Sequence, residues 1–489
     1  MTTGKILIPA ILLLMSGCNS TAAESANTSI GDEEIAVFTS SDKNLEKTYR
    51  WAKKTALGYA HDNGDPVGAW YEAALPQREA FCMRDVSHQT VGAHILGLAK
   101  HNKNMMRKFA SNISESRDYC SYWEINRYDK PAPADYASDS EFWYNLNANF
   151  DVMQACLRMY EWTADRDYIS DKDFTDFYDI SAGPYLDRWQ LRPESIMDRP
   201  RYMNQAPDFN ESNNFHSCRG LASYVENFRG LTVGVDLLAA LHGGFKAYSR
   251  IEALNGNSAR SAEASAMADA YREIIDTRWW DAAENRYNTF WTTERKFYRG
   301  EGVPFILWFD ATDKPERKQA CVADILTREW NVENMSAFPK LFYDLGYNEE
   351  AYRFLTTLPA TNRSEYPEVS YGLVEGIVCG AMGLNPSFSS KSVSSLSRID
   401  SNFCEIKNVP LFDGFISLRH DGMKSSCMKN DTGTDLEWKA SFQGEHQYLY
   451  CGADRLEASV TTDVKGNKLS YVTVTLPAKS EKAISVVKD

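Results

Sequence analysis

The 489-residue sequence lacks the short motifs that identify several common enzyme classes. It has no P-loop, no HExxH zinc motif and no convincing GxGxxG or Ser/His/Asp pattern, so nothing in it supports nucleotide-dependent, metalloprotease or serine-hydrolase chemistry. Basic residues are also in short supply, because 53 Lys and Arg stand against 67 Asp and Glu, a net charge of −14. A nucleic-acid interface needs a basic face, so we expect no nucleic-acid partner.

Cysteine pairs with the spacing of metal ligands are missing as well. Of the 10 cysteines, no two form a CxxC, which argues against zinc and thioredoxin-type sites. The sequence therefore predicts no metal and no cofactor. Cys404, Cys427 and Cys451 fall in a strand-like region, where one disulfide bond is possible.

The N-terminus has the form of a processing segment. Lys5 precedes a short apolar run, Ile6 to Met15, which ends at Ser16-Gly17-Cys18. Such a run is too short to cross a bilayer stably and is typical of a secretory signal. Its form resembles a bacterial lipobox, cleaved before Cys18.

The domain prediction for this end of the chain follows from that segment. Residues 1–17 are expected to be a lipoprotein signal peptide, Cys18 the lipidated residue, and 18–44 a flexible tether. We therefore expect a lipid-anchored protein of the bacterial cell envelope, periplasmic or at the outer membrane, which meets the membrane only through the anchor. The alternative is cleavage near Ala22 and secretion.

The rest of the chain divides into a helical part and a strand-like part. Apolar residues recur at helical spacing in segments that include Leu45–Tyr59, Val86–Leu98, Phe150–Thr163, Thr232–Leu254 and Ala262–Trp280. Polar, aromatic-rich loops separate these segments, as expected for helical hairpins arranged in a ring with function on the loops. We therefore predict a mainly α protein whose helical domain spans residues 45–386.

After Pro386 the pattern changes. A Ser-rich linker, 387–397, is expected to precede strands at Gly414–Arg419, Leu436–Gln443, Ala458–Thr462 and Lys468–Leu476. The stretch Ala483–Val487 is expected to close a hairpin with the last of these. The segment 387–489 is thus predicted to be a small antiparallel β-sandwich.

Ionisable side chains crowd among apolar ones between Leu75 and Gln89. Charges in apolar surroundings cost free energy unless they are paired or used. The segment therefore indicates a functional site, with an Arg–carboxylate network that anchors a helix start as the structural alternative. Its charged members are Arg78, Glu79, Arg84, Asp85 and His88.

Carboxylates and aromatic rings together point to carbohydrate chemistry. Glycosidic bond cleavage needs two carboxyl groups that flank the sugar, one of them protonated by burial or by a like charge. Glu79 or Asp85 is the expected acid, and Glu365 or Glu368 the expected base. The expected substrate contacts are the rings of Trp123, Trp143 and Tyr144, the polar groups of Asn145, Asn149, His88 and Glu124, and the guanidinium groups of Arg84 and Arg127, with Arg219 a further fork for a sugar carboxylate.

Two segments resemble the six-hairpin glycosidases, most of all the bacterial α-L-rhamnosidase branch. The first is Pro76-Gln77-Arg78-Glu79 followed by Asp85, where that family has Pro-x-Arg-Asp-Glu-Arg, whose Glu is the general acid, and then Gly-Trp-x-Gly-Asp. The second runs from Val369-Ser370-Tyr371-Gly372 to Gly380-Ala381-Met382-Gly383-Leu384, like the family's late helix. Here Ala80 replaces an acid, and the family's Thr-Thr-x-Trp-Glu base motif is absent.

The resemblance implies an (α/α)6 toroid followed by the β-sandwich, and an inverting mechanism. We expect a glycoside hydrolase that removes a terminal sugar, a rhamnose-like deoxysugar or a uronic acid, from plant or algal oligosaccharides or polysaccharide fragments. Two alternatives stay open. One is a polysaccharide lyase that uses His88, Tyr122 or Tyr144, and the other is a non-catalytic glycan-binding surface lipoprotein.

Overall fold

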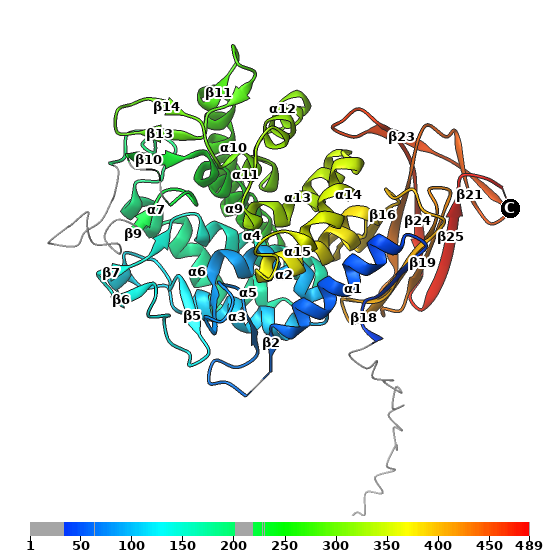
Figure 1. Cartoon of the computed structure of the whole chain (residues 1–489), viewed down its shortest axis with the longest axis horizontal. Coiled ribbons are helices and arrows are strands. Elements are labelled where there is room, and N and C mark those ends of the chain that lie inside the picture. Colours follow the sequence, from blue (N-terminus) through cyan, green and yellow to red (C-terminus); the bar gives the residue numbers. More distant parts are fainter. Residues whose placement is uncertain (1–33, 63, 201–218, 227, 229, 489) are drawn as a thin grey trace, which may run out of the picture.

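The computed structural model describes residues 34–488 except 63, 201–218, 227 and 229 (Figure 1). The predicted signal peptide, Cys18 and most of the predicted tether lie outside the described residues, so these predictions stay predictions. None of the helices in the described part is long and apolar enough to span a bilayer.

Helices dominate the chain up to Ala381. Their bounds are α1 Lys43–Gly58, α2 Met83–Ile95, α3 Ala99–Ser111, α4 Ala148–Thr163, α5 Asp167–Ser170, α6 Lys172–Ala182, α7 Pro184–Trp189, α9 Val235–Leu254, α10 Ser258–Ile274, α11 Val303–Trp308, α12 Pro315–Leu326, α13 Val332–Leu345, α14 Asn348–Thr357 and α15 Pro367–Glu375. The five helices expected from apolar spacing are all present. The expected helix from Thr232 begins late, because residues up to Gly234 belong to a strand.

Six of the described helices form a closed ring of neighbours. Helix α2 contacts α4, α4 contacts α9, α9 contacts α11, α11 contacts α13, α13 contacts α15, and α15 returns to α2. A second set packs against them, with α1 on α15, α3 on α2, α10 on α9, α12 on α11 and α14 on α13 (Figure 1). The chain therefore places its helices as an inner and an outer layer.

The sequence of each helix fits its layer. The outer helix α1 buries one stripe, which includes Leu45, Tyr49, Ala52 and Ala56, while its other positions face solvent. The inner helix α9 is apolar nearly all round and is buried over most of its length, as expected for a helix covered on all sides. The sequence pattern thus sorts the helices between the layers.

Glycines let the inner helices approach closely. A Cβ on Gly92 of α2 would stand 2.2 Å from the backbone oxygen of Tyr371 in α15. A Cβ on Gly372 would stand 2.5 Å from the backbone oxygen of Ser336 in α13. Both distances are far inside van der Waals contact, so only glycine permits this spacing of α2, α13 and α15.

Short strands accompany the helical part. They are β2 Ala60–His61, β3 Trp70–Tyr71, β4 Ala80–Cys82, β5 Glu124–Asn126, β6 Tyr136–Ser138, β7 Glu141–Phe142, β8 Tyr144–Asn145, β9 Arg219–Leu221, β10 Leu231–Gly234, β11 Trp280–Asp281, β12 Arg286–Tyr287, β13 Phe290–Thr292 and β14 Phe297–Tyr298. The antiparallel pair β4–β5 fixes the entry into the first inner helix, because it places Cys82 opposite Glu124 at the start of α2.

Two larger sheets follow the helices (Figure 1). Their strands are β1 Val37–Ser40, β15 Asn385–Ser387, β16 Ser392–Leu396, β17 Cys404–Leu411, β18 Gly414–Asp421, β19 Ser425–Asn430, β20 Leu436–Gln443, β21 Tyr448–Cys451, β22 Asp454–Glu457, β23 Ser459–Thr462, β24 Lys468–Leu476 and β25 Ser480–Ser485. One sheet has the order β1-β17-β18-β19-β25-β21-β22, and the other β15-β16-β20-β24-β23. The alternating burial of β20, with Leu436, Trp438 and Ala440 inside, is the period-2 pattern of a half-buried strand.

The expected strands at Leu436–Gln443 and Lys468–Leu476 are confirmed residue for residue. Two expectations for this region are wrong. The expected linker 387–397 contains β16 and the end of β15, whose backbones pair with each other and, through β16, with β20 in parallel. The last two strands form no hairpin, because β24 pairs with β20 while β25 pairs with β19 and β21.

The predicted tether and the possible disulfide also need correction. The tether was expected to extend to residue 44, but Val37–Ser40 pairs with β17 as an edge strand and α1 begins at Lys43. Cys404, Cys427 and Cys451 are all free thiols, so none of them forms a disulfide. The Cys427 thiol instead lies within hydrogen-bonding distance of Glu481.

The close contact between α2 and α15 can be tested with one methyl group. We expect Gly92→Ala to lower the free energy of unfolding by about 2–3 kcal/mol, because the helices must separate to admit the Cβ. Gly58→Ala in α1 is the matched control, since a Cβ there meets nothing within 4 Å. Urea unfolding measures both. Equal stability of the two variants would contradict the packing described.

Candidate active site

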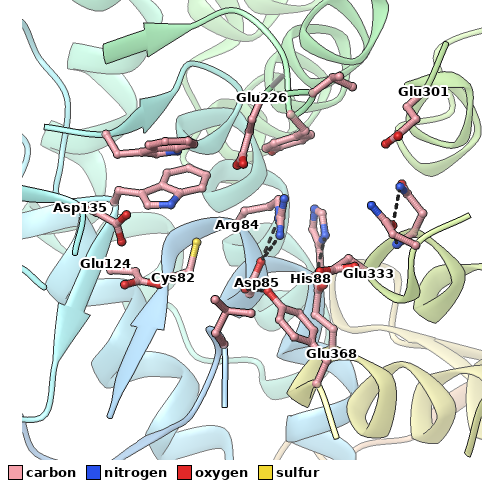
Figure 2. A pocket seen from close by; sticks show the side chains of 18 of the residues that line it. Cys82, Arg84, Asp85, His88, Glu124, Asp135, Glu226, Glu301, Glu333 and Glu368 are labelled. Carbon is pink, nitrogen blue, oxygen red and sulfur yellow. Dashed lines mark hydrogen bonds and ion pairs between the residues drawn. The ribbon is translucent and has the colours of Figure 1, made fainter. Parts of the chain in front are cut away.

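A cavity of about 450 Å³ opens at one end of the helix ring. The N-terminal turns of α2, α13 and α15 reach it, together with β4, β5 and the loops that follow β5 and β9 (Figure 2). This volume lies in the range of small-molecule sites. The segments that meet here are far apart in the sequence, as expected where loops on a rigid ring carry function.

Seven of the residues expected from the sequence line this cavity. They are Arg84, Asp85, His88, Trp123, Glu124, Trp143 and Glu368. Asp85, Glu124 and Glu368 are each at least 97% buried, although all three are acidic. The structure therefore brings together the first expected carboxyl segment and the late one.

The rival acid and base candidates lie elsewhere. Glu79 adopts a left-handed backbone with φ of 51°, and its half-exposed carboxylate pairs with Arg127 at 2.6 Å. Arg127 also binds Asp65, so this network lies beside the cavity rather than in it. Glu365 is exposed, and its backbone oxygen accepts a hydrogen bond from Tyr59. The expected roles of Glu79, Glu365 and Arg127 thus find no support in the geometry.

Three expected substrate contacts are buried scaffold instead. The Tyr144 hydroxyl donates to Oδ1 of Asn149 at 2.5 Å, and the Asn149 amide donates to Ser181 at 2.9 Å. The Asn145 amide donates to the backbone oxygen of Ser223 at 2.6 Å. These polar groups satisfy one another inside the protein, so they are not available to a ligand. Arg219, the further expected fork, is buried and pairs with Asp118.

Asp85 is the most constrained carboxyl group of the cavity. Its Oδ1 accepts from Nε of Arg84 at 2.9 Å, and its Oδ2 accepts from the Tyr366 hydroxyl at 2.8 Å. Burial raises the pKa of Asp85 above its usual range and nearby Glu368 adds to this, while Arg84 and Tyr366 oppose the shift. A base whose pKa is raised toward neutrality accepts a proton more readily than an ordinary aspartate.

A second acidic pair, Glu124 of β5 and Asp135 of the loop after it, lines the cavity. The Arg78 guanidinium lies 2.7 Å from Glu124 and 3.6 Å from Asp135, so one cation serves two carboxyl groups. Burial and the neighbouring Asp135 raise the pKa of Glu124 far above its usual range and outweigh Arg78. A raised pKa favours the protonated form of Glu124, because a buried carboxylate beside a second acid is costly.

His88 connects two further carboxylates. Its Nε2 lies 3.1 Å from Asp151 and its Nδ1 lies 3.4 Å from Glu368. Burial works against the charged ring, but Asp151 and Glu368 outweigh it and raise the pKa of His88 to about 9. His88 is therefore an imidazolium at neutral pH, which lines the cavity with the Trp308 ring at 4.9 Å.

Sequence reasoning missed Tyr366 and four acidic residues of the cavity. Tyr366 directly precedes the Pro that starts α15, and its place at a helix start could have been recognised from the sequence. The other four, Asp135, Glu226, Glu301 and Glu333, stand in loops or at helix starts and carry no periodic signal. In the described part of the chain no group of three or more His, Cys, Asp or Glu side chains is arranged to hold a metal ion.

Comparison with known proteins identifies the fold. No protein-family model and no curated protein matches the sequence. Among solved structures, an α-L-rhamnosidase from Dictyoglumus thermophilum superposes with a TM-score of 0.61 at 10% identity, over 92% of this chain and 50% of that one. A GH78 family rhamnosidase of Bacillus sp. GL1 gives 0.55 at 12% identity, over 82% and 41%.

A sialidase is similar as well, with a TM-score of 0.53 at 11% identity over 92% of this chain and 41% of that one. This chain spans half or less of the length of these three enzymes. At such identities the likeness establishes a shared fold. The chain has the architecture of known glycosidases, with many helices and a large sheet.

The buried imidazolium predicts a pH-dependent stability. The pKa of His88 is raised from 6.5 to about 9, so its contribution is complete below pH 6.5 and is lost as the pH rises through 9. That contribution is at most about 3 kcal/mol. We expect the melting temperature to fall between pH 7 and pH 9.5.

The fall should be smaller in His88→Gln, and a part should remain because the raised pKa of Glu124 also makes stability fall as the pH rises. His446→Gln is the control, because His446 has no acidic partner among the described residues. If His88→Gln keeps the full wild-type loss of stability, the assignment of the charge to His88 is wrong.

Proposed function

We propose that this chain is a glycoside hydrolase built on an (α/α)6 toroid, which removes a terminal sugar from an oligosaccharide. The observation that carries the proposal is that two carboxyl groups with opposite protonation face one cavity. Glu124 is held protonated by burial and Asp135, while Asp85 is held ionised by Arg84 and Tyr366. Separate environments for two carboxyl groups are what acid–base cleavage of a glycosidic bond requires.

Glu124 is the proposed general acid. A carboxylic acid that keeps its proton at neutral pH can give it to the leaving oxygen as the glycosidic bond breaks. Asp135 is the proposed neighbour whose negative charge keeps a proton on Glu124, and Arg78 is the cation that limits the repulsion between the two. Solvent water returns a proton to Glu124 after each turnover. The Trp123 and Trp143 rings, which line the same wall, are proposed to stack on the sugar.

Asp85 is the proposed base. In this scheme it draws a proton from a water molecule, which attacks the anomeric carbon on the face opposite the leaving group and inverts the configuration. Glu368 raises the basicity of Asp85 by its charge, and His88 holds Glu368 in place from below. The proton that Asp85 gains equals the one that Glu124 gives, so the charge of the cavity is unchanged over the cycle.

The closed helix ring supports the toroid, since an inner and an outer layer of alternating helices is the pattern expected of paired hairpins. A cavity floor made of buried side chains favours the end of a glycan over its middle. The sugar and the plant or algal source are drawn from resemblance alone. A polysaccharide lyase is less well supported, since it would need a cation for the uronate group and the cavity arginines are all paired.

Exchanging each carboxyl group for its amide tests the two roles. We expect Asp85→Asn and Glu124→Gln to lower kcat/KM by about 10²–10⁴ with the fold retained. The loss in Glu124→Gln should shrink on a dinitrophenyl glycoside, whose leaving group needs no proton, while the loss in Asp85→Asn should persist.

Glu365→Gln is the matched control, because Glu365 is exposed and lies outside the cavity. It should keep wild-type turnover. If Asp85→Asn and Glu124→Gln also keep it, the catalytic assignment fails. If no glycan in a broad panel is cleaved while calorimetry detects binding, the glycan-binding alternative holds instead.

The stereochemical outcome is a separate prediction. Proton NMR of the first product formed should show the anomer opposite to that of the substrate, because water attacks directly. Retention of configuration would require a covalent intermediate on one carboxylate and would contradict the role of Asp85 as a base acting on water.

A further inference from the structure

The cavity has an unusual excess of negative charge. Seven carboxyl side chains line it, against three arginines and His88. Each of these arginines is already engaged, Arg78 with Glu124 and Asp135, Arg84 with Asp85 and Arg363 with Glu333. His88 lies between Asp151 and Glu368. No arginine of the cavity is therefore left to bind a substrate carboxylate through two hydrogen bonds.

Two carboxylates of the cavity are left without a cation. Glu226 and Glu301 line it, both are exposed to solvent, and neither forms an ion pair or hydrogen bond with any residue that the structure describes. Figure 2 shows the Glu226 carboxyl pointing into the cavity from the side opposite Glu368. Partial burial raises the pKa of Glu226, the charge of Arg84 opposes this shift, and Asp135 and Asp85 add to it.

A buried oxygen gives independent evidence for a missing hydrogen-bond donor. Glu368 is 97% buried, and its Oε1 faces His88, but its Oε2 has no hydrogen-bond partner among the described residues. A buried carboxylate oxygen without a donor costs free energy, and such groups in native proteins are nearly always satisfied. Because Glu368 lines the cavity, a bound ligand can supply that donor.

We propose that the sugar bound in this cavity carries a protonated amine, and that Glu226, Glu301 and Glu368 select it against a sugar carboxylate. This inference rests on the proposed function and names its substrate class. An ammonium group brings a positive charge and three donors to carboxylates that have neither. A uronic acid would bring an anion to a cavity whose cations are taken, so the uronic-acid half of the sequence-based expectation is withdrawn.

Matched substrates test the selection. The test uses sets of three aryl glycosides of one sugar. The members of a set carry an amine, a hydroxyl or a carboxylate at the same carbon, which is C2 or C6. At low salt we expect kcat/KM to be at least tenfold higher for an amine substrate than for its hydroxyl counterpart, and lowest for the carboxylate. Raising the salt concentration should narrow these ratios.

Glu226→Gln tests whether the Glu226 carboxylate recognises the amine of the substrate. We expect the preference for the amine over the hydroxyl substrate to fall at least fivefold, mainly through KM. Glu79→Gln is the matched control, since it removes the same charge from a half-exposed position outside the cavity. The control should leave the preference unchanged.

The outcomes separate this inference from the proposed function. Cleavage with the neutral or the carboxylated sugar preferred overturns the inference and leaves the hydrolase standing. If no substrate is cleaved, the proposed hydrolase function is wrong. The preference for an amine is then tested separately, by calorimetry with the free amino sugar and the matching uronic acid. Tighter binding of the amino sugar, lost in Glu226→Gln, supports it, whereas equal or reversed affinities overturn it.

Discussion

The carboxylate of Asp85 is the point on which the site and the ring both depend. Arg84 and Asp85 start the first inner helix, while Tyr366 stands at the start of the last one. The hydrogen bond from Tyr366 to Asp85 therefore joins the two ends of the helical part, where α2 and α15 pack at the distance of a glycine contact. Buried charge of this kind is stable only when its partners are in place, so the contact between α2 and α15 also completes the surroundings of Asp85.

Helix termini help to stabilise the excess of carboxyl groups in the cavity. The helices α2, α13 and α15 all present their N-terminal turns to it, and the partial positive charge of each turn favours nearby carboxylates. Glu368 and Glu333 both stand in such first turns. The paired arginines Arg78, Arg84 and Arg363 offset further negative charge.

Sequence reasoning recovers what local pattern encodes. Helical spacing and strand alternation depend on each segment alone, so five helices are predicted to within a few residues and two strands to the residue. The local pattern does not decide whether Glu79 or Asp85 faces the cavity. A left-handed turn at Glu79 directs its carboxylate to Arg127 on the surface, whereas Asp85 enters the helix and faces inward. Glu226 and Asp135 come from loops, whose course is decided by tertiary contacts that no periodicity records.

The strand Val37–Ser40 links the beginning of the described chain to its last region. Its partner, β17, follows the whole helical part in the sequence, so during synthesis the first strand must wait unpaired until that part has left the ribosome. A contact of such sequence separation is slow to form and closes a very long loop. Once formed, it holds the start of α1 and the edge of the sheet together, so a pull applied at the N-terminus is borne first by the backbone hydrogen bonds of an edge strand, and only afterwards by the helices around the cavity.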